Sequence, residues 1–324
     1  MPIKLINPNN LSQLHLEGDK YTDLEGNLFP IKNGVTRIAD MNNYTKNFGM
    51  QWNKFDKTQL DRVSDGLVIS RERFFAETGW NVEDLSGNNI LEVGSGAGRF
   101  SKVILEHTLA QLYSVDYSDA VTANFKNNGD IAPDRFNLFQ ASIYEMPFPD
   151  NSFDKAFCFG VLQHTPDFES SVKALINKVK LGGEIVVDFY PIKGIWTKLH
   201  AKYIFRHITK NISHESLFKL IESNVDWIIL VSRFLRALGL GVLTRFLPLV
   251  DLSTIPHGVL TSAQFREWVV LDTFDMFSPE HDQPQKVESV AVMFNKHGVK
   301  VTFAGFVEYA EGFKAAVVRG IKIS

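Results

Sequence analysis

LEVGSGAGRF, residues 91–100, stands directly between a predicted strand and a predicted helix. Glycines at positions 94, 96 and 98 allow the backbone to turn sharply, and they leave room for a ligand against the peptide groups. The exposed N–H groups at the start of the following helix favour an anionic or polar ligand group. The stretch therefore predicts a ligand-binding turn that joins a strand to a helix.

The spacing of these glycines separates two classes of nucleotide-binding protein. The dinucleotide-binding fingerprint requires its third glycine at position 99, and Arg99 stands there instead. A nicotinamide-dependent oxidoreductase is therefore disfavoured, and it remains an alternative enzyme class.

Residues 89–190 alternate between apolar runs of strand length and helical patterns. Such alternation indicates parallel strands joined by crossover helices. A helix near 285–297 and two later strands, at 299–303 and 315–323, would complete the same sheet. The fold class expected is α/β, a doubly wound sheet with helices on both faces and its last strand antiparallel.

Polar side chains follow the ends of the predicted strands. Asp116 ends the second strand, where a carboxylate can accept both hydroxyls of a ribose. Ser142 and Ile143 follow the third strand and suit the edge and the face of an adenine. The fourth strand ends in the run from Phe159 to Asp167, which contains His164. Because the carboxyl ends of parallel strands meet at one edge of an open sheet, this edge is the expected ligand site.

Residues 89–190 resemble the core of a class I S-adenosylmethionine-dependent methyltransferase, particularly the small-molecule branch that includes quinone-biosynthesis enzymes. In that family the glycine loop holds the methionine end of the donor, and the acidic residue holds the ribose. Gln163-His164 replaces the family's usual paired histidines, and Ser142 stands where an aspartate usually meets the adenine amino group. The resemblance implies a seven-stranded Rossmann-like sheet, S-adenosyl-L-methionine as cofactor, and these cofactor-binding residues: Glu92, Gly94, Ser95, Gly96, Gly98, Arg99, Asp116, Tyr117, Ser118, Ser142, Ile143, Phe159, Gly160 and Gln163.

His164 is the candidate catalytic residue. An imidazole titrates near neutrality, so it can act as a general base beside the methyl donor. The other interpretation is that His164 caps the loop and contacts the donor structurally. At the level of the whole protein, a donor-binding module without catalysis remains an alternative to an enzyme.

The N-terminal region contains three hairpin signals, at 18–19, 25–27 and 33–34. Residues 11–38 resemble the small zinc-ribbon-like domain that precedes some methyltransferases. That domain normally carries four cysteines and this stretch has none, so we expect a metal-free form. The domains expected are a β-rich accessory domain (1–45), a helical lead-in or lid (46–88), the cofactor-binding core (89–190), a helical insertion that caps the substrate (191–260) and the C-terminal completion of the sheet (261–324). Phe48 and Trp52 are interpreted as core residues, with a cofactor lid as the alternative.

Composition limits the remaining function classes. The 324 residues carry 34 Lys and Arg against 37 Asp and Glu, a net charge of -3, which argues against a nucleic-acid partner. Cys158 is the only cysteine, so neither an intramolecular disulfide nor a multi-cysteine metal site can form, and no metal is expected. The N-terminus does not resemble a secretion signal, which favours a cytoplasmic location. Charged side chains interrupt the apolar stretch 225–250 and make a membrane span improbable.

The acceptor is expected to be a small anionic molecule, such as a sugar nucleotide, a phosphorylated glycan or a carboxylated metabolite. Residues 193–245 hold nine Lys or Arg and three Asp or Glu. This excess is typical of a solvated basic face, of an anionic substrate site, or of contact with an acidic membrane surface. Residues 268–282 are expected to form a substrate wall, or a loop packed on the edge of the sheet. The substrate-binding candidates are Arg206, Arg233, Arg236 and His281, with Lys198, Lys202 and Arg245 nearby in the sequence.

Overall fold

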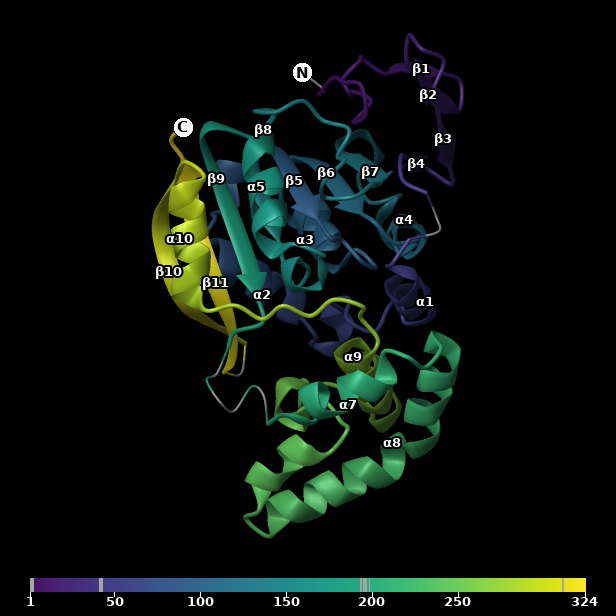
Figure 1. Cartoon of the computed structure of the whole chain (residues 1–324), viewed down its shortest axis with the longest axis vertical. Coiled ribbons are helices and arrows are strands. Elements are labelled where there is room, and N and C mark those ends of the chain that lie inside the picture. The colour runs from purple at the N-terminus through teal and green to yellow at the C-terminus, as the bar shows by residue number, and fades with distance from the viewer. Residues whose placement is uncertain (1–2, 41–42, 193, 195–196, 198, 311) are drawn as a thin grey trace. The chain divides into compact units, whose positions relative to one another are not determined.

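The computed structural model describes residues 3–40, 43–192, 194, 197, 199–310 and 312–324 (Figure 1). The chain divides into two compact units. The first, here the sheet unit, comprises Met1–Asp56, Ile69–Pro191 and His281–Ser324. The second, here the helical unit, comprises Lys57–Val68 and Ile192–Glu280.

The sheet unit contains the expected α/β fold. Its central strands run in the order β7-β6-β5-β8-β9-β11-β10, and the first five of these are parallel. The last strand of the chain, β11, is antiparallel to both of its neighbours. The sequence-based prediction of fold class is confirmed. The strands are β5 (Asn89–Val93), β6 (Gln111–Asp116), β7 (Phe136–Gln140), β8 (Phe153–Cys158), β9 (Val179–Phe189), β10 (Val299–Tyr309) and β11 (Phe313–Lys322).

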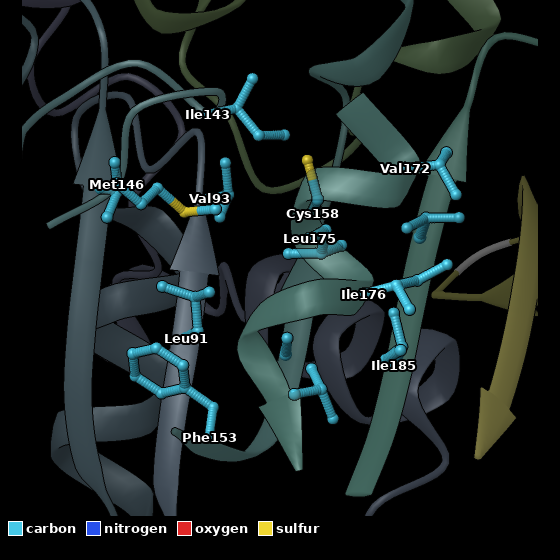
Figure 2. Close-up of a cluster of buried hydrophobic side chains, with 14 of the residues drawn as sticks. Leu91, Val93, Ile143, Met146, Phe153, Cys158, Val172, Leu175, Ile176 and Ile185 are labelled. Carbon is cyan, nitrogen blue, oxygen red and sulfur yellow. The ribbon is translucent and has the colours of Figure 1, made fainter. Parts of the chain in front are cut away.

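Helices cover both faces of this sheet. On β5, Leu91 and Val93 pack on the side of α5 (Phe168–Lys178) and α10 (Val287–Lys296), as Figure 2 shows for α5. Ile90 faces the opposite side, toward α2 (Ile69–Thr78) and α3 (Arg99–His107). Because successive strand residues point to opposite faces, β5 presents apolar side chains to both sides. Further helical segments of this unit are α1 (Lys46–Lys54), α4 (Val121–Asn128), η2 (Glu83–Leu85), η3 (Pro133–Arg135) and η4 (Leu162–His164).

The N-terminal strands form a ribbon whose turns lie at the three predicted hairpin signals. In the last turn, Asn33 and Gly34 have φ values of 51° and 73°, as a two-residue hairpin loop requires. The ribbon continues into the core sheet, because β4 pairs in parallel with β7. Over the described residues the sheet therefore has eleven strands, an extension that the sequence did not predict. The ribbon strands are β1 (His15–Glu17), β2 (Lys20–Thr22), β3 (Leu28–Lys32) and β4 (Val35–Arg37).

Asp23 joins the loops of this ribbon. Its carboxylate accepts hydrogen bonds from the side-chain amides of Asn7, Asn10 and Asn27, at 2.6, 3.0 and 2.9 Å. The bonds from Asn27 and Asn7 hold the pKa of Asp23 well below its ordinary value. One carboxylate thus links three loops of the ribbon. The resemblance to a zinc-ribbon-like domain itself stays a prediction.

The predicted helical lead-in is interrupted. Residues 57–68 leave the sheet unit between α1 and α2 and belong to the helical unit. They contain the short turn η1 (Val63–Asp65), which Gly66 ends at a φ of 76°. Helical spacing of apolar residues continues through this stretch, but the left-handed glycine breaks the helix itself.

The helical unit is built mainly from α8 (His214–Ala237) and α9 (Ser262–Phe277), whose Phe218 and Phe274 rings lie 5.7 Å apart. The remaining segments are α7 (Ala201–Thr209), η5 (Gly241–Phe246) and η6 (Leu252–Thr254). The sequence assigned residues 261–324 to the sheet, yet α9 packs on α7 and α8 and belongs to the helical unit. Within the described residues, no helix is long and apolar enough to cross a membrane.

Candidate functional site

The glycine loop, residues 94–98, joins β5 to α3. Its three glycines have φ values of 83°, 53° and 86°. Residues that carry a Cβ atom rarely adopt such positive values. A Cβ on Gly94 would lie 2.1 Å from the Val161 side chain, and one on Gly98 would lie 2.1 Å from Asn124 Oδ1. The loop therefore packs closely against α4 and against the segment that follows β8, and only glycine fits at both contacts.

Asp116 fixes this loop to the end of β6. One carboxylate oxygen accepts the Gly96 amide at 2.8 Å, and the other accepts the amide and the hydroxyl of Ser118 at 2.8 and 2.7 Å. Burial raises the pKa of Asp116, and the hydrogen bonds from Ser118 and Gly96 oppose that rise. Since a carboxylate has about four acceptor positions, the group retains capacity for a ribose hydroxyl.

Glu92 lies on β5 immediately before the loop. Its Oε2 accepts the hydroxyls of Ser101 and Ser114, the latter at 2.8 Å. Its Oε1 is buried and has no hydrogen-bond partner among the described residues. Burial raises the pKa of Glu92 to about 7, and the two serine hydroxyls oppose that rise.

Two further predicted residues carry buried polar atoms that lack partners among the described residues. They are Ser95, through Oγ, and Gln163, through both Oε1 and Nε2. Buried polar groups are normally hydrogen-bonded, so these atoms are candidates for contact with a bound ligand.

The segment that follows β8 is held by a buried ion cluster that the sequence did not reveal. The Gly160 amide donates to the Asp188 carboxylate on β9, which also pairs with Arg73 of α2. Arg73 makes a second ion pair with Glu77, at 2.7 Å. These contacts set the position of Val161 against the glycine loop. No local pattern could identify Asp188, because the sequence around it is that of an ordinary buried strand.

His164 lies on η4, in the same segment. Its Nδ1 is 3.0 Å from the carbonyl oxygen of His281, which can only accept, so Nδ1 carries the proton and Nε2 holds the lone pair. The rings of Phe48 and Tyr190 lie 5.4 and 5.5 Å from the imidazole. The structure therefore places His281, predicted to bind substrate, next to the predicted catalytic histidine.

The His281 segment is anchored on the same loop. Gln283 donates its amide to the Gln163 carbonyl at 2.8 Å and its side chain to the Thr165 carbonyl at 2.7 Å. The His281 ring contacts Tyr44, which in turn contacts the predicted residue Tyr117 at 5.4 Å. An aromatic group thus surrounds His164 and extends to the end of β6.

Helix α1 lies against the glycine loop. A Cβ on Gly96 would lie 3.3 Å from the Trp52 indole, and the Asn53 side chain donates to the Asp119 carbonyl at 3.0 Å. Trp52 is only partly buried, so it contacts the loop from a solvent-accessible position and not from the core interpreted from the sequence. In the sequence, the Phe48–Trp52 segment was the feature that could have indicated this contact.

The other predicted cofactor residues differ in their positions. Ser142 accepts the Tyr144 amide at 3.2 Å, and Ile143 lies in the buried cluster near Met146 and Cys158 (Figure 2). In contrast, two of these residues point to the α2 side of the sheet. Arg99 donates to Ser70 at 3.1 Å, and Phe159 packs 5.3 Å from Phe100.

The structure does not gather the predicted arginines into one group. Arg233 stacks 5.3 Å from the Phe265 ring centroid, and Arg236 pairs with Asp251 at 2.5 Å. Arg206 donates Nη2 to the Glu280 carbonyl at 3.3 Å, and Lys198 lies outside the described residues. Over the part of the chain that the structure describes, no group of three or more His, Cys, Asp or Glu is placed to hold a metal ion.

Replacing Gly98 by alanine tests the packing of the loop. Gly98→Ala introduces both a left-handed alanine and a collision with Asn124 and Asn128, so the free energy of unfolding should fall by about 2–4 kcal/mol. Gly182 is the matched control, because its φ is 78° but a Cβ would meet nothing within 4 Å. Gly182→Ala should cost only about 1 kcal/mol. Equal losses in chemical denaturation would show that the close contact is unimportant.

Replacing Glu92 by glutamine tests its raised pKa. Between its ordinary pKa of 4.5 and about 7, folded Glu92 keeps a proton that the unfolded chain releases. The free energy of unfolding should therefore fall across this range as the pH rises, by about 3 kcal/mol in total, and then level off. Glu92→Gln should remove this part of the pH dependence. Glu106→Gln, on the exposed side of α3, should leave it unchanged; a Glu92→Gln profile parallel to that of the wild type would contradict the assignment.

Comparison with known proteins relates part of the chain to one domain family. Residues 91–187 match a protein family described as a methyltransferase domain. A tRNA U34 carboxymethyltransferase of Nautilia profundicola is 26% identical over 137 residues, which cover 41% of this chain and 45% of that protein. A ubiquinone/menaquinone biosynthesis C-methyltransferase of Vibrio cholerae is 27% identical over 130 residues, which cover 38% of this chain and 50% of that protein.

Among solved structures, magnesium protoporphyrin IX methyltransferase of Synechocystis PCC 6803 aligns with a TM-score of 0.47 and 14% identity, over 86% of this chain and 96% of that one. The chain spans half or less of the length of the two curated relatives described above. Residues 91–187 are therefore a methyltransferase domain of the kind that uses S-adenosylmethionine.

Proposed function

We propose that this protein transfers the methyl group of S-adenosylmethionine to a small-molecule acceptor, and that His164 removes a proton from that acceptor. The observation that carries the proposal is the orientation of His164. Its Nδ1 is held by the His281 carbonyl, which leaves Nε2 as the basic nitrogen. The histidine also lies on the segment whose Val161 packs against the glycine loop.

The donor would be held by the residues that the loop brings together. The bound sulfonium supplies an already activated methyl group. Glu92 offers a buried carboxylate oxygen for the ammonium of the methionine end, and the Ser95 hydroxyl can donate to its carboxylate. Asp116 retains an acceptor position for a ribose hydroxyl. Gln163 offers both a donor and an acceptor on the neighbouring segment. Rigid loops held by buried hydrogen bonds position the reactants, which is the main contribution expected of a protein in such a displacement.

The acceptor that we propose is anionic, and Arg206 is the candidate for recognising its charge. The Nη1 atom of Arg206 is buried and lacks a hydrogen-bond partner among the described residues, while Nη2 is used by the Glu280 carbonyl. A guanidinium pairs well with phosphate or carboxylate. Arg233 and Arg236 have partners of other kinds and support this role less.

A small acceptor is favoured over nucleic acid by the charge of the chain. The curated relatives include proteins named for tRNA and for quinones, so membership of the domain family alone does not choose between acceptors. A net charge of -3 gives little of the extended basic field that binding to a phosphate backbone needs. The acceptor classes that we favour are a sugar nucleotide, a phosphorylated glycan and a carboxylated metabolite.

Replacing His164 by asparagine tests catalysis. The amide can still donate to the His281 carbonyl but lacks a basic nitrogen, so kcat should fall by about 10²–10⁴ while donor affinity is retained. The wild type and the variant are compared by mass spectrometry of cell extract incubated with isotopically labelled donor, and then by pH–rate profiles. His297→Asn, on a histidine that pairs with Glu169, is the control and should be fully active.

Two outcomes would overturn parts of this proposal. Full turnover by His164→Asn would reject the general base. Donor binding without any labelled product from the wild type would identify a binding module without catalysis.

Replacing Arg206 by glutamine tests the charge of the acceptor. Loss of charge-assisted hydrogen bonds should raise KM for an anionic acceptor by about 10- to 100-fold, with little change in kcat. Arg236→Gln, which removes the ion pair with Asp251, should leave KM unchanged. Steady-state kinetics with the acceptor found by the labelling screen measure both; an unchanged KM in Arg206→Gln would reject Arg206 as the anion contact.

A further inference from the structure

The N-terminal ribbon reaches the edge of the sheet at which the donor site lies. Arg37, the last residue of β4, pairs with Gln140, the last residue of β7. The amides of Ile38 and Ala39, which follow Arg37, both donate to the Gln140 carbonyl, at 2.9 and 3.0 Å. Gln140 in turn pairs with Asp116 at the end of β6. Because these strands are parallel, the ribbon ends at the carboxyl edge of the sheet, where ligands bind in open α/β folds.

The Arg37 guanidinium joins the end of β7 to the loop after β6, residues 117–120. Its Nη1 donates to the Asp119 carboxylate at 2.8 Å and to Gln140 Oε1 at 2.9 Å, and its Nη2 donates to the Thr122 hydroxyl at 3.0 Å. The Thr122 hydroxyl donates to the same Asp119 oxygen at 2.9 Å. The arginine side chain is only 11% exposed, so solvent and salt screen these contacts less than they would at an open surface.

The backbone of this loop is held by three further hydrogen bonds. The Gln140 side chain donates to the Tyr117 carbonyl at 3.3 Å, and the Asn43 side chain donates to the same carbonyl at 3.1 Å. Asn53 of α1 donates to the Asp119 carbonyl at 3.0 Å. Arg37 therefore belongs to a network that fixes the loop to β7, to α1 and to the segment between β4 and α1.

The elements that Arg37 joins are those assigned to the adenosine half of the donor. Asp116, directly before the loop, is the proposed ribose contact. Ser142 and Ile143, which follow β7, are the adenine contacts predicted from the sequence. A ligand binds most tightly to a site whose parts are already in place, because ordering them otherwise costs part of its binding free energy.

We propose that Arg37 is a positioning residue of the donor site, and that the N-terminal ribbon holds the adenosine half of this site in its binding geometry. Arg37 acts through Asp119, Thr122 and Gln140, and not through contact with the donor. The proposal rests on the S-adenosylmethionine site of the proposed function, but it does not depend on the general base or on the nature of the acceptor.

Isothermal titration calorimetry of the full chain with S-adenosylmethionine, and separately with S-adenosylhomocysteine, tests this role. Arg37→Met removes the donor groups of the guanidinium and keeps an unbranched apolar stem. The dissociation constant for both ligands should rise by about 10- to 30-fold, because only molecules with an ordered loop bind. Arg37→Lys keeps a positive charge for Asp119 but loses the planar fork, so its affinity should be about three- to fivefold weaker than that of the wild type.

The matched control is Arg135→Met. Arg135 lies just before β7, at the opposite end of the strand from Gln140, and donates to the Leu105 and Ala110 carbonyls at 3.1 and 2.9 Å. Both methionine variants should lower the free energy of unfolding in chemical denaturation, because both leave polar groups without a partner. Only Arg37→Met should also lose donor affinity. Thr122→Val, a milder change in the same network, should weaken donor binding by about two- to fivefold.

The outcomes separate this proposal from the proposed function. Wild-type donor affinity in Arg37→Met, or an equal loss of affinity in Arg135→Met, would overturn the role of Arg37 and leave methyl transfer standing. A wild type that binds neither ligand would reject the donor site, and with it both proposals. If Arg37→Met does not fold, wild-type affinity in both Arg37→Lys and Thr122→Val would overturn the role.

Discussion

The hydrogen bond from the Gly96 amide to the buried Asp116 carboxylate is the contact on which the site depends. It joins the turn after β5 to the end of β6, and so it fixes the backbone at the edge of the sheet where ligands bind. A buried carboxylate needs such donors, and the loop supplies one only because Gly96 has a φ of 53°. Close packing of Gly94 on Val161 then transmits this position to the segment that carries Gln163 and His164.

A second set of buried charges holds the segment that carries Gln163 and His164. Asp188 receives the Gly160 amide, and Arg73 pairs with both Asp188 and Glu77. Burial raises the pKa of Glu77, and the ion pair with Arg73 opposes that rise. Removing one member of such a cluster leaves an uncompensated buried charge, which is strongly destabilising. Each of the two loops of the site is therefore held in the same way, by a buried carboxylate that accepts a hydrogen bond from a glycine amide.

The helical unit follows a different principle, because its charges lie at the surface. Arg236 pairs with Asp251, Arg233 stacks on Phe265, and Arg266 pairs with Asp226. The distinguishing feature of this unit is an exposed apolar surface, because α8 carries one buried and one exposed apolar side. The basic excess seen in the sequence is therefore divided among separate contacts and does not form a single anion-binding cluster.

The sequence by itself determined the sheet, the glycine loop and the hairpins of the N-terminal ribbon. These features depend on strand periodicity and on glycines at positive φ, which are signals within a few residues of each other. Asp116 was also identifiable, because it ends a strand. Only the tertiary structure decided which distant residues complete the site: His281 lies 117 positions from His164, and Asp188 lies 115 from Arg73. It also turned Arg99 and Phe159 toward the α2 side of the sheet and assigned α9 to the helical unit. Such contacts arise from packing between elements, and packing leaves no periodic signal in the chain.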